Sequence, residues 1–581
     1  MAEILFIVPM KRLGLNQEAN GTLLLATKLL EAGFDAQVLR LCQIESYHQD
    51  YLTFIQDATD QIAASGAKYV SFYTLWPYYH IELRLAKELK KRGLITILGG
   101  PQSSATALAT MEAMPFVDYI CSGEGENTIV PFFQALKNGA PLDQVPGLYH
   151  RVNGQVVFND ITLPLCDLNI LPRWDDRLYA HLYPTPNPEF AGRNFFMPID
   201  AGRGCPYSCT FCCTSYFWRR TYRLKSPERI AEDIEYHNKK FGIKSFWFSH
   251  DAFTSNAKLV SQVCDHILEK KLDITWRCTA RVDCISEALI LKMKQAGMTH
   301  IELGIETGSP RMQKLINKNL NLQRARETIA FLLKNGIEVG LFFMYGFPEE
   351  TEEDLNQTLE LAFTMLDEGV SGVSMSFCKF NPATAITEKY MDQLVLDPSI
   401  QIIFRSIYGY QEEMETIQAN KTLFSFFYHL ETPLRRKYQY LHFLSYMYEL
   451  FPNSMKFVRQ LYKGDNLQFY RDFYEKNLDV FEKDTQFIWE TVKHNPMIIL
   501  DNILGGFDQP YIPQLRELLR YVHDTKAISE SQEDKISLES YNFNYQDLRL
   551  HRPIEAFTPG QTQVLMQNIG GHTNIKILRM E

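Results

Sequence analysis

The stretch Gly202–Cys213, which reads GRGCPYSCTFCC, decides how the rest of this chain is interpreted. Three of its cysteines, Cys205, Cys209 and Cys212, follow the spacing C-x3-C-x2-C within one short loop. A cubane iron–sulfur cluster needs four ligands, and cysteine thiolates usually supply them. A loop with three thiolates leaves one iron open to a small molecule, and the two glycines of the stretch let the backbone wrap closely around such a group.

Two alternatives to a cluster are a zinc knuckle and a run of buried cysteines. Zinc prefers four ligands, usually as two separated C-x2-C pairs, and the sequence has no second pair. We therefore prefer the cluster. Cys213 does not fit the spacing of the other three, so we expect it to be structural.

With Phe211 just before the third cysteine, the motif resembles the signature of radical S-adenosylmethionine (radical SAM) enzymes. In that family the open iron of a [4Fe–4S] cluster is chelated by the amino and carboxylate groups of SAM. An electron from the cluster then cleaves SAM to a 5′-deoxyadenosyl radical. The resemblance implies Cys205, Cys209 and Cys212 as metal ligands and Phe211 as a residue of the SAM site.

Length and composition indicate a globular protein of several domains. The chain has 581 residues, for which three or four domains are expected. Its 45% hydrophobic and 22% charged residues are typical of soluble proteins. The net charge of −10 argues against a general nucleic-acid binder.

The sequence gives no sign of a membrane span or a leader. No apolar run reaches the roughly 18 residues that a span requires. The first apolar run, Ile4–Val8, is short and lacks a basic segment before it, so it predicts a strand rather than a signal peptide. We therefore expect a cytoplasmic protein whose eleven cysteines are reduced.

Residues 1–145 alternate between apolar runs and helical patterns, which predicts a doubly wound parallel sheet. Such sheets bind ligands at the carboxyl ends of their strands, and glycine-rich turns follow two of these ends. The expected strands are Ile4–Val8, Ala36–Leu41, Lys68–Tyr73, Leu94–Leu98 and Val117–Cys121, and the expected helices are Asn20–Ala32, Gln56–Ala64 and Ile81–Lys91.

The turns Leu98–Pro101 and Ser122–Thr128 resemble those of the cobalamin-binding domain that precedes many radical SAM domains. The D-x-H-x-x-G signature, whose histidine ligates cobalt, is absent after the first strand. Some relatives hold cobalamin without that ligand, and others keep the fold without the cofactor. The resemblance implies a corrin site made of Thr74, Leu75, Gly99, Gly100, Gly123 and Glu124.

A proline-rich connector, residues 146–195, leads into a second series of strands and helices over 196–390. Six strand–helix units resemble the partial (β/α)6 barrel of radical SAM enzymes, in which the chemistry belongs at the carboxyl ends of the strands. The expected strands are Met197–Ala201, Lys244–Phe248, Thr275–Arg281, Thr299–Ile305, Glu338–Tyr345 and Gly372–Phe377.

Several strand ends of this series carry groups suited to SAM. Gly304–Ser309 matches the family's G-x-E-x-G/S stretch, which implies Glu306 for the ribose hydroxyls and Ser309 beside the ligand. Arg277 and Arg281 could each pair with the SAM carboxylate as a planar fork; spacing does not choose between them, although Arg281 better fits a strand end. The structural alternatives are a helix-capping role for Glu306 and surface ion pairs for the arginines.

Residues 391–581 contain aromatic-rich helical patterns without a recognised motif. Aromatic residues at helical spacing usually form a core. In the family, a helical C-terminal domain of this kind helps to close the barrel over the substrate. The polar stretch Lys526–Lys535 predicts a loop. The expected helices are Thr422–Leu430, Arg435–Leu450, Met455–Tyr462, Leu467–Lys476, Asp484–Val492 and Ile512–Val522.

Three hypotheses for function follow. The preferred one is a cobalamin-dependent radical SAM methyltransferase acting on an unactivated carbon of a small molecule or peptide, with flavodoxin or ferredoxin as reductant. The second is a radical SAM cyclase, epimerase or rearrangement enzyme that does not use the N-terminal domain for methyl transfer. The third is a non-catalytic iron–sulfur redox sensor or scaffold. The sequence identifies no catalytic side chain and no substrate.

Overall fold

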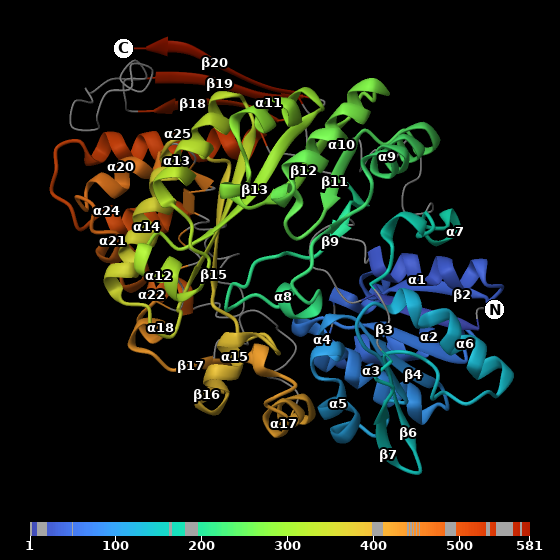
Figure 1. Ribbon diagram of the computed structural model, residues 1–581. Coiled ribbons are helices and arrows are strands. Elements are labelled where there is room, and N and C mark those ends of the chain that lie inside the picture. Colours follow the sequence, from blue (N-terminus) through green and yellow to red (C-terminus); the bar gives the residue numbers. More distant parts are fainter. Residues whose placement is uncertain are drawn as a thin grey trace. The chain divides into compact units, whose positions relative to one another are not determined.

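The computed structural model describes most of the chain as two compact units (Figure 1). Unit 1 consists of Met1–Gly304, Lys314–Glu338 and Lys379–Glu431, and unit 2 of Ile305–Gln313, Val339–Cys378 and Thr432–Glu581. The residues described are 3–8, 20–48, 50–161, 165–179, 196–397, 411–438, 441, 444, 447–448, 450–451, 454–482, 496–529, 535–541, 562–569 and 572–580.

The first sheet of unit 1 confirms the predicted doubly wound arrangement. Its strand order is β2-β1-β3-β4-β5-β6-β7, and the first five strands are parallel. Strand β1, which lies between β2 and β3, is buried along its whole length, as expected for a strand covered on both faces. The parallel strands are β1 (Ile4–Val8), β2 (Ala36–Arg40), β3 (Tyr69–Tyr73), β4 (Ile95–Gly99) and β5 (Tyr119–Cys121), and the main helices are α1 (Asn20–Glu31), α2 (Tyr51–Ala64), α3 (Tyr79–Lys91), α4 (Pro101–Ala105), α5 (Ala107–Ala113) and α6 (Ile129–Asn138).

Two antiparallel strands extend this sheet into the predicted connector. β6 (Leu148–Val152) pairs with β5, and β7 (Gln155–Phe158) pairs with β6. Asn153 and Gly154 join them with φ of 52° and 82°. Positive φ at both central residues is typical of a type I′ hairpin turn, which Asn-Gly favours. The first part of 146–195 therefore belongs to the sheet, and only the residues after β7 leave it.

Four parallel strands of the second series lie in unit 1, in the order β8-β11-β12-β13. In β11 and β12, buried residues alternate with half-buried ones, because successive side chains of a strand point to opposite faces of the sheet. The strands are β8 (Met197–Asp200), β11 (Ser245–Ser249), β12 (Thr275–Ala280) and β13 (Met298–Glu306), and the helices are α9 (Pro227–Phe241), α10 (Ala257–Glu269), α11 (Glu287–Gln295) and α13 (Leu322–Lys334).

The start of α9 shows how the sequence specifies these helices. Ser226 accepts a hydrogen bond from the Arg229 backbone N–H, Pro227 occupies the first turn, and Gly242 ends the helix in the left-handed conformation. A serine cap, a first-turn proline and a left-handed glycine are common signals for the start and end of a helix.

Unit 2 contains the remaining strands of the series and a helical region. β14 (Glu338–Tyr345) pairs in parallel with β15 (Gly372–Phe377), and α14 (Glu352–Asp367) lies between them in the chain. All six predicted strands of the second series are therefore present, which confirms the predicted fold class. Further helices of the described residues are α18 (Pro433–Lys437), α20 (Met455–Gln460), α21 (Asn466–Glu475), α22 (Leu478–Glu482), α24 (Pro496–Leu504) and α25 (Ile512–Ser529).

The C-terminal region differs from the prediction at two places, and a third prediction is not tested. A three-stranded antiparallel sheet, which sequence reasoning missed, consists of β18 (Lys535–Tyr541), β19 (Thr562–Ile569) and β20 (His572–Met580). The loop predicted at Lys526–Lys535 is wrong at both ends, since α25 continues to Ser529 and β18 begins at Lys535. The helix predicted at Asp484–Val492 lies outside the described residues.

The helix predicted at Thr422–Leu430 is also wrong, and this segment packs on the first domain within unit 1. β17 (Tyr428–Leu430) pairs with β16 (Leu394–Leu396), after a 3₁₀ turn at Ser425–Phe427. Around it, Gln102 donates to the Leu423 carbonyl at 2.9 Å, and Arg84 of α3 contacts Glu413 of α17 (Gln411–Ala419) at 3.1 Å. Among the described helices, none is long and apolar enough to cross a bilayer.

Candidate active site

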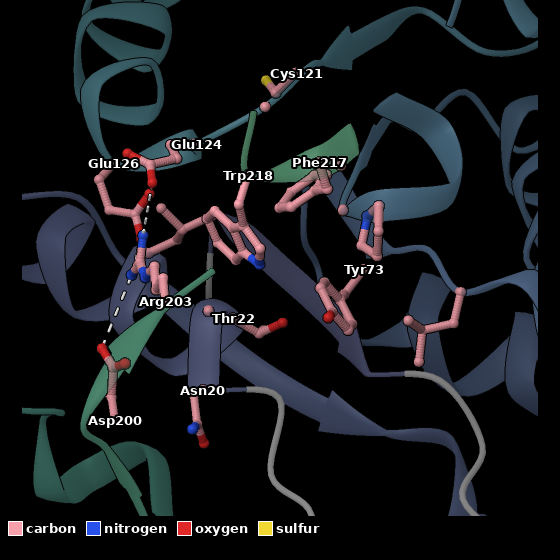
Figure 2. Close-up of a pocket in the computed structure, with 18 of the residues that line it drawn as sticks. Asn20, Thr22, Tyr73, Cys121, Glu124, Glu126, Asp200, Arg203, Phe217 and Trp218 are labelled. Carbon is pink, nitrogen blue, oxygen red and sulfur yellow. Dashed lines mark hydrogen bonds and ion pairs between the residues drawn. The ribbon is translucent and has the colours of Figure 1, made fainter. Parts of the chain in front are cut away.

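A pocket of about 590 Å³ lies within unit 1 at the carboxyl ends of the first sheet's strands. Turns after β3, β4 and β5 form one wall (Figure 2). The other wall comes from the second series, including the ends of β8 and β11 and the residues after α8 (Thr214–Phe217). Both glycine-rich turns and the neighbourhood of the cysteine loop therefore face one cavity.

Five of the six residues predicted for a corrin line this pocket, namely Leu75, Gly99, Gly100, Gly123 and Glu124. The sixth, Thr74, is fully buried beneath the turn. Its hydroxyl donates to the Gly99 carbonyl at 2.9 Å and accepts from the Ser103 backbone N–H at 2.9 Å. Thr74 thus fixes the turn rather than facing the cavity.

Gly100 adopts a conformation that other residues rarely reach. Its φ is 100° and its ψ is −179°, a region populated essentially by glycine. A Cβ atom there would lie 3.0 Å from both the backbone N and O of Thr74. The glycine lets the chain turn tightly into α4 and leaves the backbone open toward the pocket.

The Glu124 carboxylate is occupied by protein partners. It forms an ion pair with Arg223 and accepts the backbone N–H of Cys166 at 3.0 Å. The residue therefore lines the pocket while its side chain holds the chain segment that leads to the barrel. Sequence reasoning could not find this role, because Arg223 is 99 residues away in the chain.

The cysteine loop is anchored at several points by backbone hydrogen bonds. Thr210 donates its N–H to the Ile316 carbonyl at 3.0 Å and accepts the N–H of Ile386 at 3.0 Å. Gly204 donates its N–H to Asp251 at 3.0 Å. Asp251 therefore lines the pocket and also supports the loop.

The three cysteines of the motif have similar exposure, and their role as cluster ligands stays a prediction. Cys205, Cys209 and Cys212 are all half-buried, as is Phe211 between them. Within the described residues, no three His, Cys, Asp or Glu side chains converge closely enough to hold one metal ion.

Burial raises the pKa of the Cys205 thiol to about 11 in the absence of metal. A cluster reverses this effect, because coordinated cysteines are thiolates. Cys213 is placed differently, at the start of α8. Burial also raises the pKa of its thiol, and its structural role stays a prediction.

Arg281 lies beside the cysteine loop, but its guanidinium is already bonded. It forms two hydrogen bonds with Asp283, at 3.0 and 2.9 Å, and a third with the Lys318 carbonyl at 2.9 Å. It stacks on Tyr207, with 3.8 Å between the guanidinium carbon and the ring centroid. One nitrogen remains 3.9 Å from the Cys209 sulfur. Arg281 thus lies next to a predicted cluster ligand, and its guanidinium is already bonded to Asp283 and to the Lys318 carbonyl.

Arg277 is held more loosely on the inward face of β12. Its guanidinium lies over Phe196 at 4.8 Å and over Trp247 at 5.4 Å from the ring centroids. Its contact with Glu302 is 3.8 Å long. Arg277 therefore has fewer hydrogen-bond partners than Arg281.

Glu306 and Ser309 lie in unit 2. Glu306, at the end of β13, is 8% exposed and has a φ of 69°. Positive φ in a residue other than glycine indicates strain that is often kept at functional sites. Ser309 is buried, and its hydroxyl donates to Asp354 at 2.5 Å and accepts the Met312 N–H at 3.2 Å. Its side chain therefore caps α12 (Pro310–Leu315).

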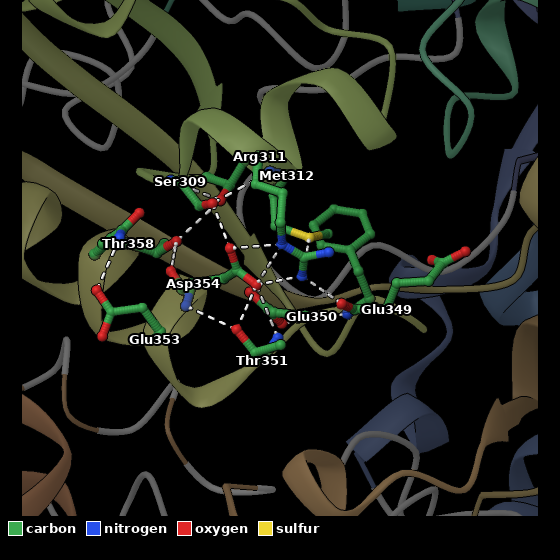
Figure 3. A network of polar contacts seen from close by, with 12 residues as sticks. Ser309, Arg311, Met312, Glu349, Glu350, Thr351, Glu353, Asp354 and Thr358 are labelled. Atoms are coloured by element: carbon green, nitrogen blue, oxygen red, sulfur yellow. Dashed lines mark hydrogen bonds and ion pairs between the residues drawn. The ribbon is translucent and has the colours of Figure 1, made fainter.

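Asp354 is the centre of a polar network in unit 2 (Figure 3). It completes a capping box with Thr351 at the start of α14 and pairs with Arg311. Although burial opposes it, hydrogen bonds from Arg311, Ser309 and Thr351 lower the pKa of Asp354. The neighbouring Glu350 behaves oppositely, since burial raises its pKa to about 8 despite hydrogen bonds from the Gly346 and Phe347 backbones.

Sequence reasoning missed several residues that line the pocket. Asp200 ends β8, and His250 directly follows β11. Their position at strand ends was therefore an available signal. Trp218 and Arg203 had no such signal apart from their closeness to the cysteines in the chain. The missed lining residues include Asp200, Arg203, Phe217, Trp218, Trp247, Ser249 and His250.

Comparisons with known proteins agree with this geometry. Residues 199–362 match the family model of the radical SAM superfamily. An uncharacterized methyltransferase of Pyrococcus horikoshii is 30% identical over 287 residues, which cover 48% of this chain and 60% of that protein. The anaerobic magnesium-protoporphyrin IX monomethyl ester cyclase of Rubrivivax gelatinosus is 29% identical, with 48% and 50% covered. This chain thus matches about half to three-fifths of these relatives' lengths.

Solved structures show the same fold. The radical SAM methyltransferase TsrM from Kitasatospora setae superposes with a TM-score of 0.56 at 15% identity, over 68% of this chain and 76% of that one. The cobalamin-dependent SAM radical enzyme OxsB superposes with a TM-score of 0.57 at 14% identity, over 91% and 82%. Residues 199–362 of this chain thus match the radical SAM superfamily model, and the chain shares the fold of these two solved structures.

Proposed function

We propose that this protein is a cobalamin-dependent radical SAM enzyme that methylates an unactivated carbon of a small molecule or peptide. One observation carries the proposal: the pocket that the glycine turns share with the residues flanking the cysteine loop. A cofactor bound to the turns would face a substrate in the barrel. The names of relatives support methyl transfer, since they include a hopanoid C-3 methylase of Methylococcus capsulatus, 25% identical over 56% of this chain.

Each region has a part in this proposal. Residues 1–145 would hold cobalamin, 146–195 would link the domains after the β6–β7 hairpin, 196–390 would form the radical SAM barrel, and 391–581 would cap the substrate. Cys205, Cys209 and Cys212 would ligate the cluster. When bound, the cluster and SAM supply a 5′-deoxyadenosyl radical that removes a substrate hydrogen atom, and cobalamin supplies the methyl group.

The protein's own residues prepare the site for this chemistry. Gly99 and Gly123 let backbone N–H groups approach the amide and phosphate oxygens of a corrin. Tyr73, Phe217 and Trp218 line the cavity with aromatic surface, which excludes water from a radical intermediate. Arg281 would place a positive charge beside the Cys209 thiolate and so stabilise the charged ligand.

Glu306, in its strained conformation at the end of β13, would accept hydrogen bonds from the SAM ribose. Arg277 becomes the better candidate for the SAM carboxylate, because Arg281 is already bonded to Asp283 and the Lys318 carbonyl. A flavodoxin or ferredoxin would supply the electron.

A second candidate function is a radical cyclisation or rearrangement, favoured by the similarity to the Rubrivivax gelatinosus cyclase. One set of measurements separates the possibilities. The protein is purified and reconstituted without oxygen, then given SAM with a deuterated methyl group, hydroxocobalamin and dithionite. We expect corrin uptake and 5′-deoxyadenosine from SAM.

The product then distinguishes the chemistry. With extracts of the host as substrate source, a product heavier by a labelled methyl group supports methylation. Corrin uptake with an unlabelled, rearranged product would favour the second candidate. Absence of both 5′-deoxyadenosine and corrin uptake would leave only a redox sensor or scaffold.

A further inference from the structure

Arg203 lies two residues before Cys205 in a backbone that is fixed on both sides. β9 (Gly202–Arg203) pairs with β10 (Arg223–Leu224) in an antiparallel ladder. A Cβ atom on Gly202 would lie 2.3 Å from the Arg223 carbonyl oxygen, and one on Gly204 would lie 2.1 Å from that of Thr221. These contacts leave no room for side chains, so the two glycines set the path of the chain and with it the direction of Arg203.

The Arg203 side chain joins the cysteine loop to the glycine turn after β5. It is 8% exposed, and one guanidinium nitrogen donates to Glu126 at 2.5 Å. Glu124 lies at 3.7 Å and Asp200 at 3.9 Å from the same guanidinium. Figure 2 shows the guanidinium between Asp200 and the two glutamates, and all four residues line the pocket.

Trp218 adds a second connection between the pocket and the cysteine loop. Its ring lies under two guanidinium groups, 5.5 Å from that of Arg203 and 6.0 Å from that of Arg223. It directly follows α8, which begins just after Cys213. A ligand in the pocket would therefore contact both the acidic turn and an aromatic ring that touches Arg203.

We propose that Arg203 is a positioning residue that couples occupancy of the pocket to the geometry of the cysteine loop. This inference rests on the proposed function, in which a corrin fills the pocket. Separating a buried ion pair leaves uncompensated charges, which is strongly unfavourable. The Arg203–Glu126 ion pair therefore stays together when the turn at Glu126 shifts, and the shift is passed on to Arg203. Arg203 belongs to β9, which leads straight into Cys205.

Thermodynamic linkage makes the coupling measurable from either site, since two coupled ligands change each other's affinity by the same factor. The holoprotein with its reconstituted cluster is titrated anaerobically with SAM by calorimetry, with and without hydroxocobalamin. In the wild type we expect the two SAM dissociation constants to differ by about 5-fold or more. The electron paramagnetic resonance spectrum of the reduced cluster should change when hydroxocobalamin is added.

Two variants remove the connection in different ways. Glu126→Gln keeps the shape and removes the charge, whereas Arg203→Lys keeps the charge and removes the planar fork. In either variant the ratio of the SAM dissociation constants should fall toward one, and the cluster spectrum should no longer respond to hydroxocobalamin. Iron content should stay at the wild-type level, which shows that the loop still folds.

A matched control lies at the start of β5, the strand whose other end leads into the turn with Glu126. Asp118 precedes β5 and pairs with Lys90 at 2.6 Å, outside the pocket lining. Asp118→Asn makes the same acid-to-amide change and should keep the wild-type coupling. A wild-type ratio of one, or full coupling in a folded Glu126→Gln or Arg203→Lys protein, overturns the inference while leaving the proposed function intact. If the wild type takes up no hydroxocobalamin, both are overturned.

Discussion

Replacement of Gly100 by alanine tests whether the turn after β4 holds a corrin by its backbone. The conformation at Gly100 is essentially reserved for glycine, and an added Cβ would meet two Thr74 backbone atoms at 3.0 Å. Backbone strain of this kind costs about 1–3 kcal/mol. The turn can relieve it only by moving away from Thr74, and this movement displaces Gly99 and Leu75 in the pocket wall.

The strain sets the expected loss of affinity. We assume that the turn relieves the strain in the free protein and that the bound corrin restores it. A strain of about 1–3 kcal/mol then raises the dissociation constant of the corrin by roughly 5- to 150-fold. Absorbance titration with hydroxocobalamin measures this directly and does not require two-state unfolding, which a chain of several domains rarely shows. Iron content serves as the check that the cysteine loop is intact.

Gly372→Ala provides the control. Gly372 begins β15 outside the pocket lining, and its added Cβ would meet no atom within 4 Å. We therefore expect corrin affinity close to that of the wild type. A Gly100→Ala protein that is folded and binds hydroxocobalamin as tightly as Gly372→Ala would refute the reasoning, because the turn's backbone geometry would then not matter for binding.

Three other predictions concern the cluster, SAM and pH. Alanine at Cys205, Cys209 or Cys212 should abolish iron binding and 5′-deoxyadenosine formation, whereas Cys213→Ala should retain both; the reverse pattern would show the ligand assignment to be wrong. Glu306→Ala should weaken SAM binding by about 1–3 kcal/mol with an unchanged cluster absorbance, and an unaltered dissociation constant would return Glu306 to a structural role. Glu350 is protonated in the folded protein up to a pKa of about 8 but ionises near 4.5 when unfolded, so stability should fall as pH rises between these values. Glu350→Gln should flatten that part of the thermal-unfolding profile, and an unchanged slope would contradict the assignment.

Local signals made much of the fold predictable from the sequence. Ser226, Pro227 and Gly242 mark both ends of α9 because capping depends on residues only a few positions apart. The Asn153-Gly154 pair likewise carries its own turn type, although sequence reasoning placed it in a connector. Gly570-Gly571 between two apolar runs was a comparable hairpin signal before β20, and it was overlooked among helical patterns.

Long-range contacts explain what sequence reasoning could not find. Arg203 and Glu126 are 77 residues apart, and no periodicity connects them. Thr74 was expected to line the corrin site, and its burial beneath the turn depends on contacts with Gly99 and Ser103 that the sequence does not show. Arg281 was preferred over Arg277 for its position at a strand end, and only the structure shows that Asp283 already occupies its fork.

The packing of residues 411–431 on the first domain bears on how this chain is made. Arg84 and Glu413 are 329 residues apart, and Tyr79 and His80 of α3 pack against Phe424 and Phe427. At about 5–20 residues per second on the ribosome, the covering segment follows α3 by roughly 15–65 s. Until then, an apolar face of the first domain is exposed. A fragment ending near residue 390 should therefore need a chaperone or aggregate, even though it contains every predicted cofactor ligand.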